Sequence, residues 1–342
     1  MGKSKTGVNV PPSTEGICSF RSEGAPVSPL RRIAPHRIPN ILIPRADMPV
    51  MILDQEVSSE QSLAFKEQAL ETLQRLPPFS PVFNKLLGSL SKEDASVSEL
   101  SDWVERDAII AGQLLRTVNS AAYGCRGTVS GVRHAVALLG IPKLRNLTLG
   151  LSVSRLFSQL RVPAGWSTAR YNLHSAACAI MADQMAMHTK VDFGEGAFAA
   201  GLLHDIGRMV IALGLPKELA LIQQLERETG NPVWQCEQEV LGFSHGELSG
   251  LILKRWNLPK PIQLAAETHH FPPAQYQQGL MPLGQIVALA NETINKMGIS
   301  IAPNSVTPED VSAFLEERGF GKTQEKILNT FVLEFEAMRT TF

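Results

Sequence analysis

Helix signals follow one another along this chain from Ser59 onward, and no stretch up to Gln159 has the period-two alternation of a useful β-strand. In two capping boxes, built on Ser96 and on Ser244, the serine and a glutamate three residues later pair with backbone N–H groups of the first turn. Apolar side chains then recur at three- and four-residue spacing. The sequence therefore predicts an all-α fold.

Caps and breakers give the expected helix boundaries. Asp107 can cap a helix whose Ile110, Leu114 and Val118 share one face, and a turn is expected at 123–127. Further helices are predicted from Ser130 to Gly140, from Pro142 past Leu151, from Ser167 through His188, over 198–213 with Gly214 at the end, from Asn231-Pro232, from Ser244, over 262–270 and 283–296, from Thr307-Pro308-Glu309-Asp310, and through Ile327, Phe331, Phe335 and Met338.

The chain divides into a tail and a helical body. Residues 1–57 are rich in proline and carry no persistent apolar period, so we expect a flexible tail, with a short interaction arm as the alternative. The Pro- and Gly-containing stretch 161–166 is the best internal boundary, which separates a helical half at 58–160 from a second half at 161–300. Residues 301–342 form a C-terminal helical extension.

Composition limits the classes of function. Apolar residues make up 44% of the chain and charged residues 19%, enough for a sizeable core. Lysine plus arginine (32) nearly balance aspartate plus glutamate (33), which argues against nucleic acid and anionic membranes as partners. No signal-peptide core or membrane-length apolar run stands out, and the four scattered cysteines are typical of reduced thiols. We expect a soluble, cytoplasmic protein.

Histidines concentrate in one part of the sequence. Of eight, six lie between His174 and His270, including an adjacent His204-Asp205 pair inside an apolar helical segment and a His269-His270 pair at a helix end. Imidazole nitrogen and carboxylate oxygen are ligands for divalent iron, manganese, zinc or nickel, and such a metal can activate water near neutral pH. A shared metal site is one interpretation; a histidine locked by a carboxylate in a packing role is the other.

Helical spacing predicts where two further histidines point. His174 lies on one stripe with Tyr171, Cys178 and two methionines, so it faces the core as a ligand or as a buried, hydrogen-bonded histidine. His245 lies in the first turn of its helix, where surface or capping use is the alternative to ligation. Cys178 is a soft ligand in principle, but we interpret it as a small core residue.

Several motifs together resemble one family. The order His174, His204-Asp205 and later histidines resembles the HD superfamily of metal-dependent phosphohydrolases, and in particular its HDOD branch. The resemblance spans roughly 68–275 and implies a helical N-terminal half packed on an HD-like half at 161–300, in regulatory output modules of bacterial signalling that generally lack a demonstrated activity. The motifs are Leu76–Pro81 leading into 82–90, Asp107–Ala121 with Tyr123-Gly124, Ala135–Gly140, Gly201–Gly207, Ser244-His245 through Pro259, and His269-His270.

The resemblance also implies site residues. His174, His204 and Asp205 match the first three ligand positions of the HD pattern, and His245 with His269 or His270 falls where the related HD-GYP branch has extra histidines. Two departures weaken an enzymatic interpretation. Asn291 stands where the pattern expects its closing aspartate, and Phe-Pro-Pro, not Gly-Tyr-Pro, follows the histidine pair.

Three functions remain open. The favoured hypothesis is a non-catalytic signal-transduction output or interaction module with signalling proteins as partners. The alternative is a metal-dependent phosphohydrolase acting on a nucleotide or cyclic dinucleotide, with His174, His204 and Asp205 holding the metal. Nucleic-acid binding through the basic N-terminal arm is disfavoured by the balanced charge and the three tyrosines.

Overall fold

The protein is described by a computed structural model over most of its body. The chain divides into the units Met1–Asp54 and Gln55–Phe342, and all that follows concerns the second. In the described ranges the secondary structure is helical, apart from an isolated bridge between Val191 and Met281, which confirms the all-α prediction. The predicted tail lies outside them except for Val57, and the predicted turn lies largely outside. The described residues are 57–76, 80–90, 96–120, 123, 127–272, 279–302 and 308–339.

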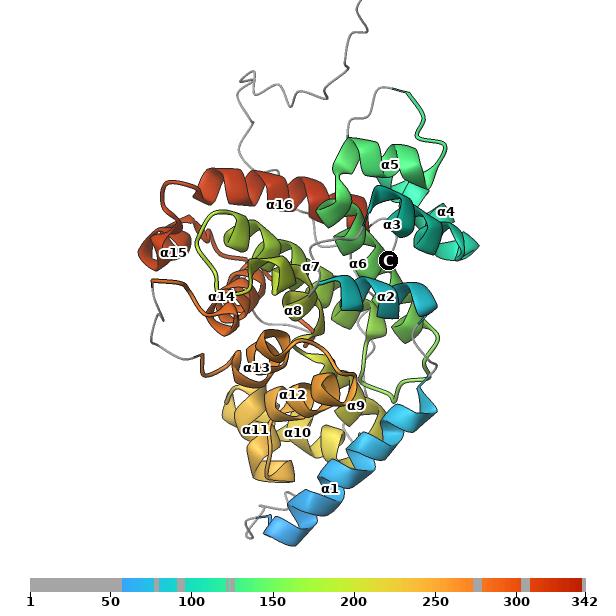
Figure 1. The fold of residues 1–342 in the computed structure, drawn as a ribbon. Helices are drawn as coiled ribbons and strands as arrows, with labels where there is room; N and C mark the ends of the chain where they lie inside the picture. Colours follow the sequence, from blue (N-terminus) through green and yellow to red (C-terminus); the bar gives the residue numbers. More distant parts are fainter. Residues whose placement is uncertain are drawn as a thin grey trace, which may run out of the picture. The chain divides into compact units, whose positions relative to one another are not determined.

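The first part of the fold is a group of mutually packed helices (Figure 1). Ser96 caps α3 in the predicted capping box, and the Asp107 carboxylate accepts the N–H groups of Ile109 and Ile110 at the start of α4. The apolar faces of these helices turn inward, with Leu114 fully buried. The helices are α2 (Pro81–Ser89), α3 (Val97–Glu105), α4 (Ala108–Val118), α5 (Val132–Leu139) and α6 (Ile141–Ser158).

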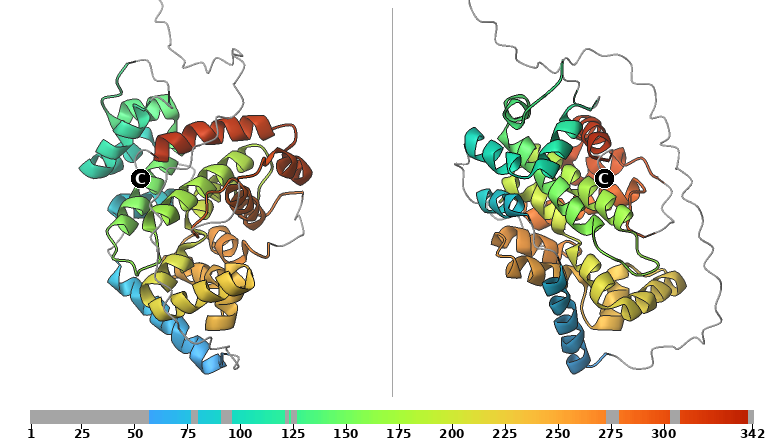
Figure 2. Two further views of the ribbon diagram at one scale, coloured as in Figure 1. Left: turned by 180° about the vertical axis from the view of Figure 1, so that it is seen from behind. Right: turned by 90° about the vertical axis from the view of Figure 1, so that its right-hand side faces the viewer.

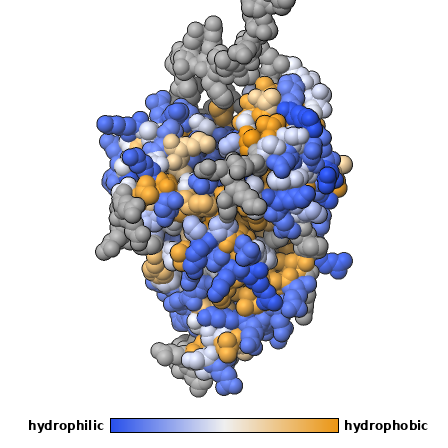
Figure 3. Space-filling model, in the orientation of Figure 1, coloured by the Kyte–Doolittle hydropathy of each residue, from blue (hydrophilic) through white to orange (hydrophobic). Residues whose placement is uncertain are grey.

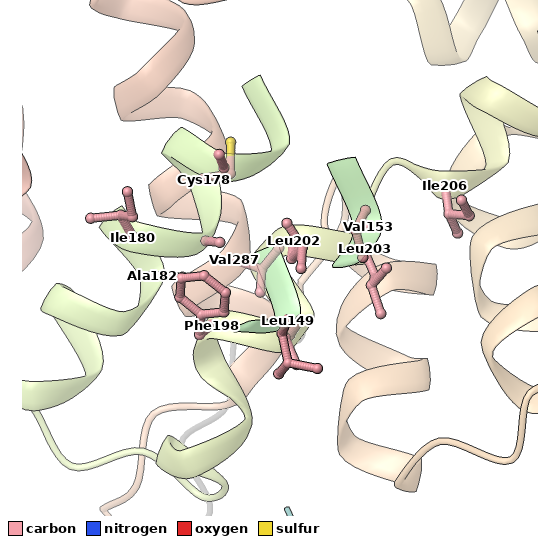
Figure 4. Close-up of a cluster of buried hydrophobic side chains, with 14 of the residues drawn as sticks. Leu149, Val153, Cys178, Ile180, Ala182, Phe198, Leu202, Leu203, Ile206 and Val287 are labelled. Carbon is pink, nitrogen blue, oxygen red and sulfur yellow. The ribbon is translucent and has the colours of Figure 1, made fainter. Parts of the chain in front are cut away.

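Helix α7 (Thr168–Met187) lies at the centre of the fold and is buried over most of its length. It packs against α6, α8 (Ala197–Leu203), α14 (Leu283–Lys296) and α16 (Gln324–Arg339). Figure 4 shows part of this core, where Phe198 and Leu202 of α8 lie among apolar side chains of α6, α7 and α14. Because solvent is excluded on nearly every side of α7, a polar side chain on it needs an internal partner.

The remaining helices pack as a second group, which α1 (Ser59–Thr72) joins from the start of the sequence. The views in Figures 1 and 2 place α1 alongside α9 and α11, and the Gln68 side chain donates to the Gly214 carbonyl at 2.8 Å. This group contains α9 (Ile206–Gly214), α10 (Pro216–Thr229), α11 (Val233–Leu241), α12 (His245–Arg255) and α13 (Lys260–Thr268). The short elements are η1 (Leu73–Arg75), η3 (Gly194–Gly196), α15 (Ser312–Leu315) and η4 (Glu316–Phe320).

The single helix predicted over 198–213 is wrong, because α8 ends at Leu203 and α9 begins at Ile206. Asp205 has φ −97° and ψ 14°, outside the α-helical region, and its carbonyl accepts the Arg208 N–H in a tighter turn. The His204-Asp205 pair therefore occupies a helix break and not a helix interior. Apolar periodicity continued across the break and concealed it.

Other boundaries also differ from the prediction. Helix α5 is capped by Gly131 in an extended conformation and not by Ser130, and the chain reaches α15 only at Ser312, beyond the predicted Thr307–Asp310 start. Helix α10 was not predicted, although Pro216 lies in its first turn and Gly230 ends it in the left-handed region at φ 70°.

The C-terminal helix completes the core. Phe331 and Phe335 of α16 stack at 5.4 Å between ring centroids, and both are buried with Met338. Within the described residues, one run, Gly194–Gly214, is long and apolar enough to cross a membrane by composition, but 89% of that window is buried inside the protein, as in a core segment. The face in Figure 3 alternates hydrophilic and hydrophobic areas.

Candidate metal centre

Two glycines allow four helices, α7, α8, α9 and α12, to pack closely around the helix break. A Cβ atom on Gly201 would lie 2.7 Å from the Cys178 carbonyl oxygen, so α8 can approach α7 only without a side chain there. A Cβ atom on Gly207 would lie 2.2 Å from the His245 carbonyl oxygen, so α9 also can approach α12 only without a side chain at this position. The glycines that flank His204-Asp205 in sequence therefore bring His174 and His245 within reach of Asp205.

Four imidazoles converge on the Asp205 carboxylate. Oδ2 lies 3.7 Å from Nε2 of His174 and 3.6 Å from Nε2 of His204. Oδ1 lies 3.0 Å from Nε2 of His245 and 3.5 Å from Nε2 of His269. All five side chains are buried. Each carboxylate oxygen thus faces its own pair of histidines, contributed by separate parts of the chain.

The rings are oriented by their other nitrogens. In three histidines Nδ1 contacts a backbone carbonyl, which can only accept, so Nδ1 carries the proton and Nε2 of the neutral ring presents its lone pair to the centre. This is the orientation that metal-binding histidines require. The three donor and acceptor pairs are His174 with Ile299, His204 with Gly201, and His269 with Ala266, each at 2.8 Å.

A glutamate orients the fourth ring. Nδ1 of His245 donates to Oε2 of Glu237 at 2.6 Å, and the same oxygen accepts the His245 backbone N–H at 2.7 Å. Sequence reasoning missed Glu237. The available signal was its place on the buried face of α11 with Val240 and Leu241, three and four residues later, where a charged residue needs an internal partner.

The sixth predicted residue, His270, lies beside this ring, with its Nε2 2.9 Å from Nε2 of His245. His245 itself is fully buried and makes neither a surface nor a simple capping contact. The structure thus brings all six predicted candidates together. Their ligand atoms fall into overlapping groups, each within 4.8 Å: His174, Cys178 and His204; His204, Asp205 and His269; and His245, His269 and His270.

Charge is unevenly distributed in the centre. Burial alone would raise the pKa of Asp205, but His204 and His245 hold that pKa well below its usual range. Burial alone would lower the pKa of His245, but Glu237 and Asp205 raise it to about 9. Burial lowers the pKa of His204 to about 3, and it also lowers that of His174. The inner histidines are therefore neutral and the carboxylate is ionised, which is the protonation state of metal ligands.

One buried nitrogen supports a cation at this position. Nε2 of His204 makes no hydrogen bond in the described part of the chain and is fully buried. A buried polar atom without a hydrogen bond destabilises the folded protein unless a ligand binds to it. The donor set of imidazoles and one carboxylate fits a divalent transition metal.

A cavity of about 850 Å³ opens onto one side of the centre. Asp205, His245, His269 and His270 line it, whereas His174, Cys178 and His204 do not. The Asp205 carboxylate therefore separates an inner group of histidines, closed by packing, from an outer group that a ligand can reach. The wall also includes Arg208, Trp234, Asn291 and Lys296.

Asn291 occupies this wall as a neutral amide. Its Oδ1 accepts a hydrogen bond from the Asn295 side chain at 2.8 Å, one helical turn further along α14. An amide oxygen is a poorer metal ligand than a carboxylate, and it adds no negative charge. Among the residues lining the cavity, the acidic side chains are Asp205, Glu226, Glu292 and Glu309.

The fold and the centre together define a helical protein of the HD type. Residues 76–272 match the sequence profile of the HDOD domain, and the chain belongs to the HDOD family, as the motifs predicted. A protein of Treponema pallidum (strain Nichols), whose name is "Uncharacterized protein", is 25% identical over 214 residues. That alignment spans 60% of this chain but only 39% of the relative.

Solved structures share the fold. An HDOD domain protein of unknown function from Geobacter sulfurreducens superposes with a TM-score of 0.69 at 22% identity, covering 82% of this chain and 99% of that one. A protein of Marinobacter aquaeolei VT8, named as a proposed signal transduction protein, gives 0.64 at 22% identity, covering 82% and 65%. A proposed phosphohydrolase of Shewanella amazonensis SB2B gives 0.62 at 22% identity, covering 80% and 97%.

Proposed function

We propose that this protein is a signal-transduction output module whose histidine–aspartate centre holds a divalent metal and acts through binding, without turnover. The observation that carries the proposal is the convergence of oriented imidazoles on Asp205. In each of the four histidines, Nδ1 contacts a backbone carbonyl or Glu237, and Nε2 of the same ring faces the Asp205 carboxylate. Such an arrangement is organised for a cation before the cation arrives.

The neutral Asn291 supports the non-catalytic part of the proposal. A hydrolytic metal centre both holds its metal and compensates the charge that develops on the phosphoryl oxygens and the attacking water. Here Asp205 is the one carboxylate that contacts the histidines from the helix break, while Glu237 is engaged by His245. A centre with this donor set suits metal retention and ligand binding.

Metal analysis and turnover test this proposal separately. We expect near-stoichiometric metal in full-length protein purified without chelator, and its loss in a His204→Ala/Asp205→Ala variant. We expect no hydrolysis of bis-p-nitrophenyl phosphate or of cyclic dinucleotides beyond that of the same double variant. Turnover that depends on His204 would contradict the non-catalytic assignment, and absence of metal after reconstitution with iron, manganese and zinc would contradict the metal centre.

A second candidate, a metal-dependent phosphohydrolase, is favoured by the cavity. A bound metal would polarise a phosphoryl oxygen and activate water. Arg208 places a cation on the wall, and the Trp234 ring, packed edge-on against Phe271 at 4.6 Å, offers a surface on which a nucleobase could stack. The substrate class would then be a nucleotide or cyclic dinucleotide.

A gain-of-function variant distinguishes the two candidates. Asn291→Asp restores a carboxylate on the same wall at nearly the same volume. If the centre lacks hydrolytic activity only because this carboxylate is missing, Asn291→Asp should hydrolyse substrate where the wild-type protein does not. Asn295→Asp, one turn along α14, is the matched control because it adds equal charge to the same cavity.

A further inference from the structure

The inner group contains, besides His174 and His204, a third residue that the family pattern does not include. Cys178 lies one helical turn beyond His174 on α7, and its Sγ is 3.5 Å from Nε2 of His174. The ligand atoms of Cys178, His174 and His204 lie within 4.8 Å of one another, and all three residues are buried. The unpartnered Nε2 of His204 belongs to this group, which is the independent sign of a missing ligand.

The distances fit tetrahedral coordination. With Zn–S and Zn–N bonds of ~2.3 and ~2.05 Å, a tetrahedral angle places sulfur and nitrogen ~3.6 Å apart, and nitrogen and oxygen ~3.4 Å apart. The Cys178 Sγ to His174 Nε2 distance is 3.5 Å. Asp205 Oδ2 lies 3.6 and 3.7 Å from the His204 and His174 nitrogens. Three of the six ligand pairs of a four-ligand site therefore lie within about 0.3 Å of the tetrahedral separations.

Charge favours the same assignment. A divalent ion bound by Asp205 and two neutral imidazoles keeps one uncompensated positive charge in a buried site, where Arg208 already lies 3.6 Å from Asp205 Oδ2, and this is unfavourable. Asn291 does not supply the second negative charge. Binding of the metal to Cys178 displaces the thiol proton to solvent as the S–metal bond forms, and the thiolate supplies that charge.

We propose that Cys178 is a metal ligand, and that His174, Cys178, His204 and Oδ2 of Asp205 form a closed site for a thiophilic ion of the zinc type. The proposal rests on the proposed function, since it specifies the metal held by the same centre. Four protein ligands, of which only Asp205 lines the cavity, define a structural site. Ligand exchange is left to the outer group of His245, His269 and His270.

Cobalt substitution tests the ligand directly. Full-length protein is stripped of metal and titrated with Co²⁺ alone, and we expect a thiolate-to-cobalt charge-transfer band in the near ultraviolet with the strong visible bands of tetrahedral cobalt. Both should vanish in Cys178→Ser and in Cys178→Ala. A Cys18→Ser/Cys125→Ser/Cys236→Ser variant, which retains Cys178 alone, should keep them.

The outcomes separate this inference from the proposed function. Cobalt that binds without the band, or a band that survives in Cys178→Ser, overturns the Cys178 assignment and leaves a histidine–aspartate metal centre. Cobalt that does not bind at all overturns both. Circular dichroism of each variant shows that loss of the band is not loss of fold.

Metal preference supplies a second readout. Loss of a side chain that only orients a ligand typically lowers metal affinity ~10–100-fold. Loss of a ligand itself should lower the affinity by at least as much. We therefore expect Cys178→Ser to lose more than ~10-fold in zinc affinity while manganese, which gains little from sulfur, changes far less. Equal changes for the two ions would contradict thiolate ligation.

Discussion

Two polar clusters, buried or half-buried, lie along α7, and they differ in the groups that surround their carboxylates. Toward the C-terminal end, Asp183 accepts from the Asn146 side chain at 3.1 Å, and Glu334 of α16 pairs with Lys143 and accepts from Gln184 at 3.3 Å. There each carboxylate has a donor or a cation beside it. Such a cluster attaches one helix to another.

Asp205 also has cations beside it, Arg208 at 3.6 Å and the protonated His245 at 3.0 Å, but here neutral imidazoles are added to them. Nε2 of His204 is left without a hydrogen bond within the described residues. Burial of polar groups alone therefore does not indicate a ligand site. Several lone pairs directed at a common point do, because one cation can satisfy all of them at once.

The strongest test of the first cluster removes its cation. Lys143→Met leaves the buried Asp183 and the half-buried Glu334 without Lys143, and we expect a loss of about 3 kcal/mol in the free energy of unfolding. Chemical denaturation measures it. The Lys143→Met/Glu334→Met double variant should recover part of the loss, and a loss in Lys143→Met no larger than that of an exposed lysine would contradict the role of the pair.

Gly207→Ala should affect the second cluster. Its Cβ would meet the His245 carbonyl oxygen at 2.2 Å, so α12 must move away from α9, at an expected cost of about 2 kcal/mol with weakened metal binding. Gly88→Ala is the suitable control, because an added Cβ atom there meets open space. Gly230→Ala is unsuitable, because the positive φ of Gly230 would itself strain an alanine. Thermal unfolding and metal titration of both variants check the prediction.

Glu237→Gln should separate orientation from stability. The amide keeps the volume but cannot hold the His245 ring through a charge-assisted bond, so we expect a ~10–100-fold loss of metal affinity with a small change in unfolding. Isothermal titration with Zn²⁺ measures the affinity. Glu239→Gln, at an exposed position two residues further along the same helix, is the matched control.

The smallest expected effect is a change in pH dependence. Burial raises the pKa of Asp183 above its ordinary value, although Lys143 and Asn146 oppose the shift. The folded state therefore binds a proton more readily than the unfolded state, so stability falls as pH rises from the unfolded pKa through the folded one. Asp183→Asn should flatten that fall in thermal denaturation between pH 4 and 8, and an unchanged slope would contradict the shift.

Local signals predicted much of the fold. Ser96, Ser244 and Asp107 cap helices because a side-chain oxygen satisfies N–H groups nearby in sequence, whatever the tertiary context. The helix break at His204-Asp205 was not predictable in this way. It depends on contacts of α8 with α7 and of α9 with α12, which are remote in sequence.

The candidate site was predicted in its members but not in its arrangement. The six histidine and aspartate candidates came from motif order, and the structure places them together. The partner of His245, Glu237, lies in a different helix, and the alignment of Cys178 with His204 requires the close approach that Gly201 permits. Side chains that meet only through helix packing leave no spacing signal in the sequence.

The central claim is that the convergent histidines bind metal. Mass spectrometry of tag-free, full-length protein purified without chelator, beside the His204→Ala/Asp205→Ala variant, tests it most directly. We expect near-stoichiometric metal in the wild-type protein and its loss in a folded variant. Wild-type protein that stays metal-free after reconstitution with iron, manganese and zinc would contradict it.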